Sequence, residues 1–307
     1  MTEKKNKKIL YIEILGDLAT AAIKFVFGII GNSSVMIAEG FHSIADTANQ
    51  IFLLVGVYSS KRTPDIKHQF GYGKEKFFWA FLSAVFILSV SATSSVREGI
   101  SKLRDPGTLS NFWLSILILG ISLIFQLINL FFSSAYFRSL LKAIKIKKGF
   151  FHKLEYIKEP TIINLWFGDI LAIAGNLIAI LTLVVVKLSG NAIYDGIGSI
   201  LIGVLLGIFA IFLIRDVKGL LIGEAASPII YEKIISLISQ NKAVNSIVNI
   251  KTMHLSPTEI LLNADLEFKD NLSTEEIEKT IDEIEKSLKN EIEGLKQINI
   301  EAEPKDN

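Results

Sequence analysis

The sequence predicts an α-helical membrane protein in which six transmembrane helices are followed by a cytosolic α+β domain. Three observations predict this class. Half of the 307 residues are hydrophobic, the long apolar runs lie before residue 222, and the sequence after that point is mixed and acidic. An apolar run of about 20 residues is long enough to cross a bilayer. We therefore expect a transmembrane domain at 1–221 and a cytosolic domain at 222–307.

Six apolar runs satisfy the bilayer-length criterion. The first is the least apolar, because it contains Glu13, Asp17 and Lys24. Short polar segments such as "GNSS" and "KLSGN" separate the runs on one side. The expected spans are 10–31, 34–59, 77–101, 111–136, 161–188 and 193–214.

Lysine and arginine are distributed unevenly between the two ends of these spans. Sixteen lie at the N-terminus and in the segments after the second and fourth spans, whereas four lie on the other side. Because cytoplasmic loops carry the excess of positive charge, both termini are expected in the cytoplasm. The basic segment 139–160 is expected to contact anionic membrane lipid. It has a single histidine, His152, so it does not resemble a histidine-rich loop that collects zinc.

The chain after residue 222 is expected to form a small α+β domain of order αββαβ. Ser273 and Glu276 predict a capping box at the start of its second helix. The domain has 9 lysines against 17 acidic residues, which argues against nucleic acid as a partner. Its small core favours packing against a second copy. The expected elements are a helix at 228–240, strands at 247–255 and 259–268, a helix at 274–290 and a strand at 297–302.

A stripe of polar side chains interrupts the second span. It consists of Glu39, His42, Asp46 and Asn49. Their spacings of three, four and three place them on one face of a helix. Ionisable groups at membrane depth are costly and mark functional sites. Imidazole nitrogen and carboxylate oxygen suit divalent metals, zinc first and then cobalt, iron or manganese, so His42 and Asp46 are predicted metal ligands.

The fifth span has a single acidic residue, Asp169. Nothing else in this apolar helix accounts for a carboxylate, so Asp169 is predicted as a further metal ligand. Asn176 follows seven residues later on the same face. We expect it to form a hydrogen bond between helices, with a role at or behind the metal as the alternative.

The turn between the first two spans allows depths in the membrane to be compared. If its apex lies near residue 31 or 32, residues equally far from the apex lie level with each other. This places Lys24 opposite Glu39 and Asp17 opposite Asp46. We interpret Lys24 and Glu39 as a structural ion pair, the alternative being a role in ion selection. Asp17 either supplies charge to the metal or lies in a water-filled vestibule.

Four motifs resemble the cation diffusion facilitator family: "SSVMIAEGFHSIADTANQ", "RTPDIKHQFGYGKEKFFWA", "GNAIYDGIGSILIGVLLG" and "KGLLIGEAASP". The tail motifs "TMHLSPTEILL" and "INIEAEP" are most similar to the zinc-transporter-9-like branch and its bacterial relatives. The resemblance covers about residues 10–303. It implies six spans, a homodimer, a ferredoxin-like cytosolic domain, and metal–proton exchange by alternating access. His42 and Asp46 match the family's ligand pair in the second span.

The fifth span departs from the family pattern, in which two ligands lie four residues apart. Both neighbours of Asp169 at that spacing, Leu165 and Ile173, are apolar. The resemblance therefore implies three protein ligands, completed by water, Asn176 or Asp17.

Two places outside the membrane are weaker metal candidates. Some relatives hold an interfacial metal at the loop "DIKHQFGYG", where this chain has Asp65 and His68 but Tyr72 in place of a further histidine. We interpret this loop as structural, because Gly71 and Gly73 permit a tight turn. In the cytosolic domain His254, with Glu301 and Glu303, is the other candidate, and we interpret these as surface residues.

These observations predict an efflux transporter, not an enzyme. It would export a divalent metal ion, zinc first, in exchange for protons across a bacterial inner membrane, with no permanently bound cofactor. Two alternatives remain: a membrane-anchored metal sensor without transport activity, and a transporter selective for manganese, iron or cobalt. An intramembrane metallohydrolase would need an HExxH motif, and "HSIAD" lacks its glutamate.

Overall fold

The computed structural model describes residues 3–143 and 160–304. Most of the basic segment expected to contact lipid, including His152, lies outside these residues. The described residues form two compact units, which are treated separately below. The first takes those within Met1–Ser59, Phe78–Lys145 and Pro160–Val217, and the second takes those within Ser60–Phe77 and Lys218–Asn307.

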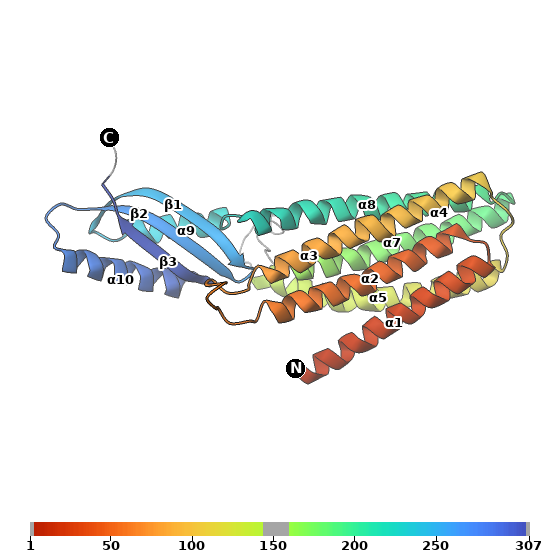
Figure 1. Ribbon diagram of the computed structural model, residues 1–307, viewed down its shortest axis with the longest axis horizontal. Helices are drawn as coiled ribbons and strands as arrows, with labels where there is room; N and C mark the ends of the chain where they lie inside the picture. Colours follow the sequence, from red (N-terminus) through yellow and green to blue (C-terminus); the bar gives the residue numbers. More distant parts are fainter. Residues whose placement is uncertain (1–2, 144–159, 305–307) are drawn as a thin grey trace. The chain divides into compact units, whose positions relative to one another are not determined.

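Long helices make up the first unit (Figure 1). One of them is continuous over Glu75–Arg104 but changes to π-helical geometry for six residues in the middle. Each expected span falls on one of these helices. They are α1 (Glu3–Ile30), α2 (Ser34–Ser59), α3 (Glu75–Phe86) continued by η1 (Ile87–Ala92) and α4 (Thr93–Arg104), α5 (Phe112–Ala143), α7 (Pro160–Ser189) and α8 (Ile193–Ile222).

Four of the described helices are long and apolar enough to cross a membrane. They are the helices over Glu75–Arg104, Phe112–Ala135, Ile163–Ser189 and Ile193–Ile222. Large apolar side chains on them remain exposed within the chain, for example Trp113 and Phe131 on α5 and Ile208 on α8. Such apolar faces are typical of helices that contact lipid. The helices α1 and α2 do not meet the same criterion. They carry Asp17, His42 and Asp46 of the candidate site, whereas Asp169 lies on α7, which does meet it.

The turn between α1 and α2 lies where the sequence placed it. Asn32 adopts a positive φ of 48°, and the amide of Ser33 donates to the carbonyl of Gly28 over 2.8 Å. A Cβ on Gly28 would lie 2.8 Å from Ile37, so glycine allows the two helices to approach closely. The predicted pairing of equal depths starts from this turn.

Asp195, in the first turn of α8, caps the start of α2. Its carboxylate accepts the backbone amide of Ser34, the amide of Val35 over 3.3 Å, and the hydroxyl of Ser33 over 3.1 Å. A carboxylate at a helix N-terminus satisfies free amides and complements the helix dipole. This contact joins α8 to the helix that carries the polar stripe, and sequence patterns did not predict it.

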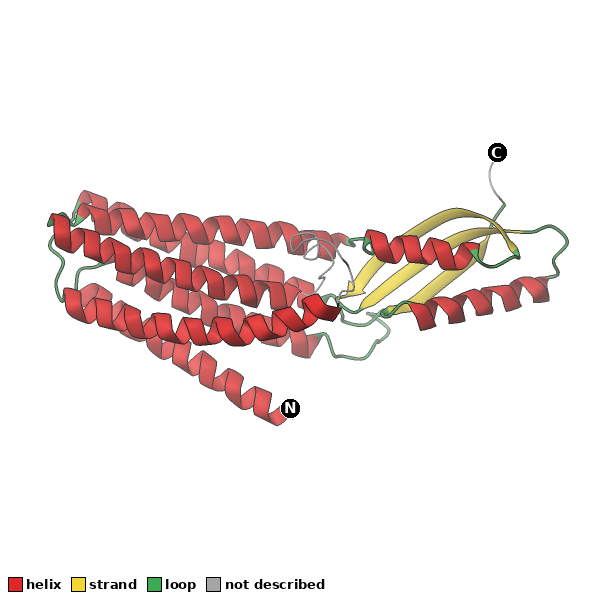
Figure 2. Ribbon diagram, turned by 180° about the vertical axis from the view of Figure 1, so that it is seen from behind, coloured by secondary structure: helices red, strands yellow, loops and turns green. Residues whose placement is uncertain are grey.

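The second unit contains a three-stranded mixed sheet and two helices (Figure 2). The strand order is β1-β2-β3, with β1 and β2 antiparallel and β2 and β3 parallel. The predicted order αββαβ is confirmed, although β1 begins three residues earlier than expected. The elements are α9 (Pro228–Ser239), β1 (Val244–Ser256), β2 (Glu259–Phe268), α10 (Thr274–Glu291) and β3 (Leu295–Ala302).

One core holds this small domain together. Alternate residues of β2, such as Leu262 and Leu266, point to the same face of the sheet and contact Ile234 of α9 and Leu288 of α10 in one cluster. The predicted capping box is present: the Ser273 hydroxyl accepts the Glu276 amide over 3.3 Å, and the Glu276 carboxylate accepts the Ser273 amide over 2.7 Å.

Candidate metal site

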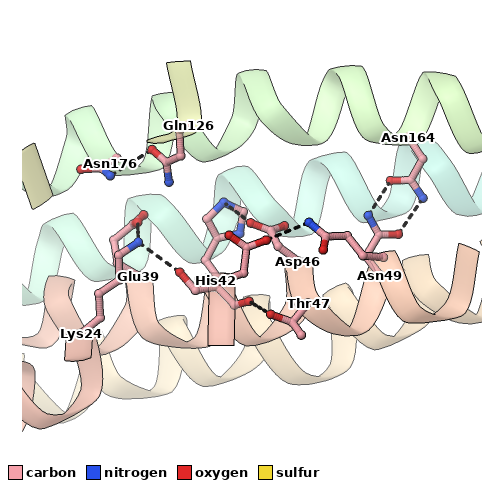
Figure 3. Close-up of polar contacts among 12 residues, drawn as sticks. Lys24, Glu39, His42, Asp46, Thr47, Asn49, Gln126, Asn164 and Asn176 are labelled. Atoms are coloured by element: carbon pink, nitrogen blue, oxygen red, sulfur yellow. Dashed lines mark hydrogen bonds and ion pairs between the residues drawn. The ribbon is translucent and has the colours of Figure 1, made fainter. Parts of the chain in front are cut away.

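The polar stripe of α2 lies along one face of the helix, as its spacing predicts (Figure 3). Glu39, His42 and Asn49 are almost completely buried, whereas the side chain of Asp46 is 28% exposed. The Nε2 atom of His42 lies 3.6 Å from Oδ2 of Asp46. Both residues therefore face the same space from consecutive turns.

Both ring nitrogens of His42 are buried, and neither has a hydrogen-bond partner among the described residues. A buried polar atom without a partner is uncommon, because its lost hydration is not replaced. Metal coordination is one way to satisfy an imidazole nitrogen. The environment of His42 thus fits a ligand better than it fits a purely structural histidine.

Three carboxylates from three helices line one cavity of about 50 Å³. They are Asp17 of α1, Asp46 of α2 and Asp169 of α7. Asp46 interacts electrostatically with both of the others. Like charges in one enclosed space repel each other unless a cation or a proton lies between them. A volume of this size holds a few water molecules or a small ion.

A second, smaller cavity shares Asp46 with the first. It is lined by His42, Asp46, Asn49 and Asn164, with apolar residues of α7 and α8. Asp46, Asn49 and Gly168 line both cavities, so the cavity beside His42 adjoins the cavity of the three carboxylates. Among the described residues, however, no three histidine, aspartate or glutamate side chains lie in an arrangement that would hold a metal ion. The candidate residues are gathered around adjoining cavities but do not form a closed ligand set.

Lys24 and Glu39 form a fully buried ion pair, as their equal distance from the turn predicted (Figure 3). The Lys24 ammonium donates to Glu39 Oε2 over 2.9 Å and to the Ser43 hydroxyl over 3.1 Å. The other carboxylate oxygen, Oε1, lies against Gly175 of α7, where a Cβ would come within 2.7 Å of it. Glu39 is thus bound to Lys24 and packs against the backbone of α7, the helix that carries Asp169.

Asp17 lines the cavity, and it forms a hydrogen bond with a residue that the depth comparison did not place opposite it. Gln50, one turn beyond Asp46, donates to the Asp17 carboxylate over 2.8 Å. The depth comparison assumes two parallel helix axes, whereas α1 diverges from α2 toward its N-terminal end (Figure 1). The hairpin therefore predicted the shared depth of Asp17 and Asp46 but not the contact with Gln50.

Asn176 is buried and lines neither cavity. Its amide donates to Oε1 of Gln126 on α5 over 2.9 Å (Figure 3). The hydrogen bond between helices that we expected for Asn176 is therefore present. Gln126 in turn lines the cavity of the three carboxylates.

Sequence reasoning missed the contribution of α5 to this cavity. Ser122, Gln126 and Asn129 all line it. Their spacings of four and three put them on one face of an otherwise apolar helix. The same polar periodicity that singled out the stripe of α2 could have found them.

An asparagine pair connects the two candidate ligand helices one turn from Asp46. Asn49 of α2 accepts the Asn164 amide of α7 over 3.1 Å and donates back over 3.4 Å (Figure 3). Ser83 of α3 donates to the same Asn49 oxygen. This network joins α2, α3 and α7 beside the smaller cavity, and sequence patterns did not predict it, although they marked Asn49 as a polar residue of the stripe.

The loop that contains Asp65 and His68 forms a tight turn. Asp65 accepts the amides of Lys67 and His68 over 2.9 and 2.7 Å and the Tyr72 hydroxyl over 2.7 Å. These hydrogen bonds lower the pKa of the Asp65 carboxyl, and the Tyr72 hydroxyl has the largest effect, with the His68 amide next. Gly71 has a positive φ of 80°, which supports the structural interpretation of the loop. The Asp65 oxygens are thus occupied by groups of the turn.

His254 differs from the expectation of a surface residue. It lies at the end of β1, is 4% exposed, and its Nδ1 lies 3.4 Å from the Ser256 carbonyl. On β2, His254 pairs with Ile260, whereas the exposed Glu301 of β3 pairs with Asp265. The two pairing positions on β2 are five residues apart. His254 and Glu301 therefore lie about 17 Å apart along the strand direction, at the usual rise of about 3.3 Å per residue, and on the strands that flank β2. They do not form one metal site within a single chain.

The apolar helices around a buried, carboxylate-lined cavity define an integral membrane protein with a polar interior site. Comparison with known families then identifies its family. The model of the cation efflux transmembrane domain matches residues 10–222, and the model of the cation efflux protein cytoplasmic domain matches residues 226–305. The chain belongs to the cation diffusion facilitator family of metal transporters.

Three relatives illustrate the range of the family around this chain. Metal tolerance protein C4 of Arabidopsis thaliana is 34% identical over 80% of the chain and 54% of the relative. The mitochondrial proton-coupled zinc antiporter SLC30A9 of Mus musculus is 26% identical over 87% of the chain and 47% of the relative. The chain thus spans about half the length of these two proteins. The manganese efflux system protein MneP of Bacillus subtilis is 23% identical over 98% of the chain and 97% of its own length.

Proposed function

We propose that this protein exports a divalent metal ion, zinc first, in exchange for protons. The observation that carries the proposal is the cavity lined by Asp17, Asp46 and Asp169, which adjoins the buried His42, whose ring nitrogens form no hydrogen bond with the described residues. We assign direct binding to His42, Asp46 and Asp169, with Asp17 supplying charge. The names of the relatives, which include a proton-coupled zinc antiporter, support the same activity.

Proton coupling follows from the chemistry of these ligands. A histidine nitrogen or a carboxylate must be deprotonated before it coordinates a metal. Metal and protons therefore compete for the same atoms. On the side with the higher proton concentration, protonation of the ligands weakens metal binding and releases the ion. Access to the site would alternate between the two sides, as the family resemblance implies.

The proposal includes an arrangement in the membrane. At 28 and 26 residues, α1 and α2 are about 40 Å long at the usual rise per residue, which is enough to cross a bilayer. We propose that they complete six spans within a transmembrane domain at 1–221, with both termini and a ferredoxin-like domain at 222–307 in the cytoplasm. A homodimer in the inner membrane of a bacterium is the assembly and location we propose.

Flux in proteoliposomes tests the function. Purified protein is reconstituted with a metal-sensitive dye inside the vesicles, and a pH gradient is imposed. We expect His42→Ala and Asp169→Asn to lower zinc flux by at least about tenfold. Removing a residue that only supports a metal ligand already lowers affinity or activity by about 10–100-fold, and removing the ligand itself should cost at least as much. Asn176→Ala, which removes only the hydrogen bond to Gln126, is the matched control and should retain more activity.

The outcomes separate the proposal from its rivals. A membrane-anchored sensor would show no flux that depends on the pH gradient. Wild-type flux in His42→Ala would remove His42 from the site. Equal losses in Asp169→Asn and Asn176→Ala would mean that the ligand of α7 has been assigned incorrectly.

Manganese is the second candidate cargo, and two observations favour it. The larger cavity is lined by three carboxylates and several amide side chains, and oxygen ligands of this kind suit manganese. The relative that aligns along nearly its whole length with this chain is named a manganese efflux protein. Competition among zinc, manganese, iron and cobalt in titration calorimetry decides between them. If zinc is preferred because of the imidazole, His42→Asn should reduce the preference for zinc over manganese.

A further inference from the structure

Gln50 is a polar residue of α2 to which the proposed function assigns no role. It follows Asp46 by four residues and His42 by eight, so the three side chains lie on one face of the helix. Gln50 lines the larger cavity, the one with the three carboxylates. The side chain thus continues the ligand spacing of α2 by one further turn.

The neighbouring carboxylate of α1 fixes the orientation of the Gln50 carboxamide. Its Nε2 atom donates to Oδ2 of Asp17 over 2.8 Å. An ionised carboxylate only accepts hydrogen bonds, so it selects the amide nitrogen as its partner. The amide oxygen of Gln50 is therefore turned away from Asp17.

The amide oxygen of Gln50 is buried and has no hydrogen-bond partner among the described residues. A buried acceptor without a partner is costly, because its lost hydration is not replaced. Two other amide oxygens of the cavity wall are already occupied. That of Asn49 accepts the Asn164 amide over 3.1 Å, and that of Gln126 accepts the Asn176 amide over 2.9 Å. The oxygen of Gln50 differs from them in having no donor.

We propose that the amide oxygen of Gln50 binds the transported metal ion together with Asp46 and Asp169, while Asp17 holds the amide in place. This inference rests on the proposed function, because it adds a ligand to the same site. An amide oxygen is a neutral, hard ligand of the kind that manganese prefers, whereas zinc is usually bound by nitrogen, sulfur or carboxylate. Gln50 therefore raises the affinity for manganese relative to zinc. The amide does not titrate near neutral pH, so it adds affinity without adding a proton to the exchange.

Titration calorimetry of the full chain with manganese and with zinc tests the proposal. We expect Gln50→Leu to lower manganese affinity by at least about tenfold, since even residues that only support a metal ligand usually contribute 10–100-fold. Zinc affinity should fall less, so the preference for manganese over zinc should fall. Gln126→Leu is the matched control, because it removes the same kind of side chain from the same cavity but one whose oxygen is already occupied. Unchanged manganese affinity in Gln50→Leu, or an equal change of preference in the two variants, would overturn the proposal.

A double-variant cycle separates a metal ligand from a residue that only holds Asp17. Asp17→Asn removes the charge but keeps an oxygen that accepts the Gln50 amide. If Gln50 binds the metal, Gln50→Leu should still lower manganese affinity in the Asp17→Asn background. If the effect of Gln50→Leu disappears in that background, Gln50 acts only through Asp17 and the proposal is wrong.

A spectroscopic measurement covers the case in which Gln50→Leu folds poorly. Gln50 and Gln126 are the two glutamines that line the cavity. Gln126→Leu is therefore prepared with glutamine that carries the magnetic carbon isotope at its carboxamide, and it is loaded with manganese. Electron–nuclear double resonance should detect a coupling between the metal and the labelled carbon, and the absence of a coupling in the loaded protein would overturn the proposal.

The binding measurements do not depend on transport, so the two proposals can fail separately. Zinc flux driven by a pH gradient, with a manganese preference that Gln50→Leu leaves unchanged, would overturn only the role of Gln50. A preference that depends on Gln50, in a protein that shows no flux of either metal, would overturn the proposed transport and support the ligand.

Discussion

The buried ion pair of Lys24 and Glu39 gives a stability prediction whose size follows from the structure. Both side chains are fully buried, and the ammonium lies 2.9 Å from the carboxylate. Lys24→Met keeps a long unbranched side chain but leaves Glu39 buried without its counter-ion. Breaking a buried pair in this way costs about 3–5 kcal/mol in the free energy of unfolding. The double variant Lys24→Met/Glu39→Met removes both charges and should recover most of that loss, because apolar replacements of buried pairs are often neutral.

The assay is thermal unfolding of purified protein in detergent, followed by tryptophan fluorescence, since the chain has three tryptophans. With about 2–4 °C per kcal/mol for domains of 150–250 residues, the single variant should melt roughly 10 °C below wild type. Lys289→Met breaks the exposed pair with Glu285 on α10 and is the control, with an expected cost of about 0.5 kcal/mol or less. Melting of Lys24→Met within about 2 °C of wild type, or a double variant less stable than the single one, would refute the reasoning.

Three further predictions follow from other contacts. Gly175→Ala places a Cβ 2.7 Å from the buried carboxylate of that ion pair, so it should destabilise the fold by about 1–3 kcal/mol in thermal unfolding, whereas Gly168→Ala, with open space at its Cβ, should melt like wild type. Asp17→Asn should weaken metal affinity by about 10–100-fold in calorimetry if Asp17 supports the site, and unchanged affinity would assign it to a vestibule. Hydrogen bonds from Ser273 lower the pKa of Glu276. The charged Glu276 therefore stabilises the cytosolic domain at any pH above the ordinary pKa of a glutamate, and this stabilisation is lost as the pH falls through the lowered pKa. Ser273→Ala should therefore reduce stability by about 1 kcal/mol near neutral pH in denaturant titrations of the full chain, and a cost that does not shrink in acid would contradict this.

Local sequence patterns were sufficient to predict the features that involve residues close together in the chain. The spacing of Glu39, His42, Asp46 and Asn49 placed them on one face because a helix repeats every 3.6 residues. The turn near residue 31 predicted that Lys24 and Glu39 lie at the same depth, because two residues equally far from a short turn lie level when the two helices run side by side. The capping box was visible for the same reason, since its partners are three residues apart.

Contacts between distant segments were beyond the reach of these patterns. The sequence showed that Asp169 is unusual in its helix, but only packing brings it to the same cavity as Asp17 and Asp46. Gln126 contacts Asn176 across fifty residues of sequence. The partner of such a side chain depends on the rotation and crossing of whole helices, which one sequence does not specify.

By itself, the sequence determined the class of protein, the order αββαβ and the residues of the polar stripe, because hydrophobic periodicity and capping are local properties of the chain. Only the tertiary structure decided that Asp195 caps α2, that His254 is buried, and that α5 contributes amide side chains to the carboxylate cavity. Burial and contact are properties of the space between elements. That space is set by the packing of side chains from several helices or strands at once, so it is not present in any single segment.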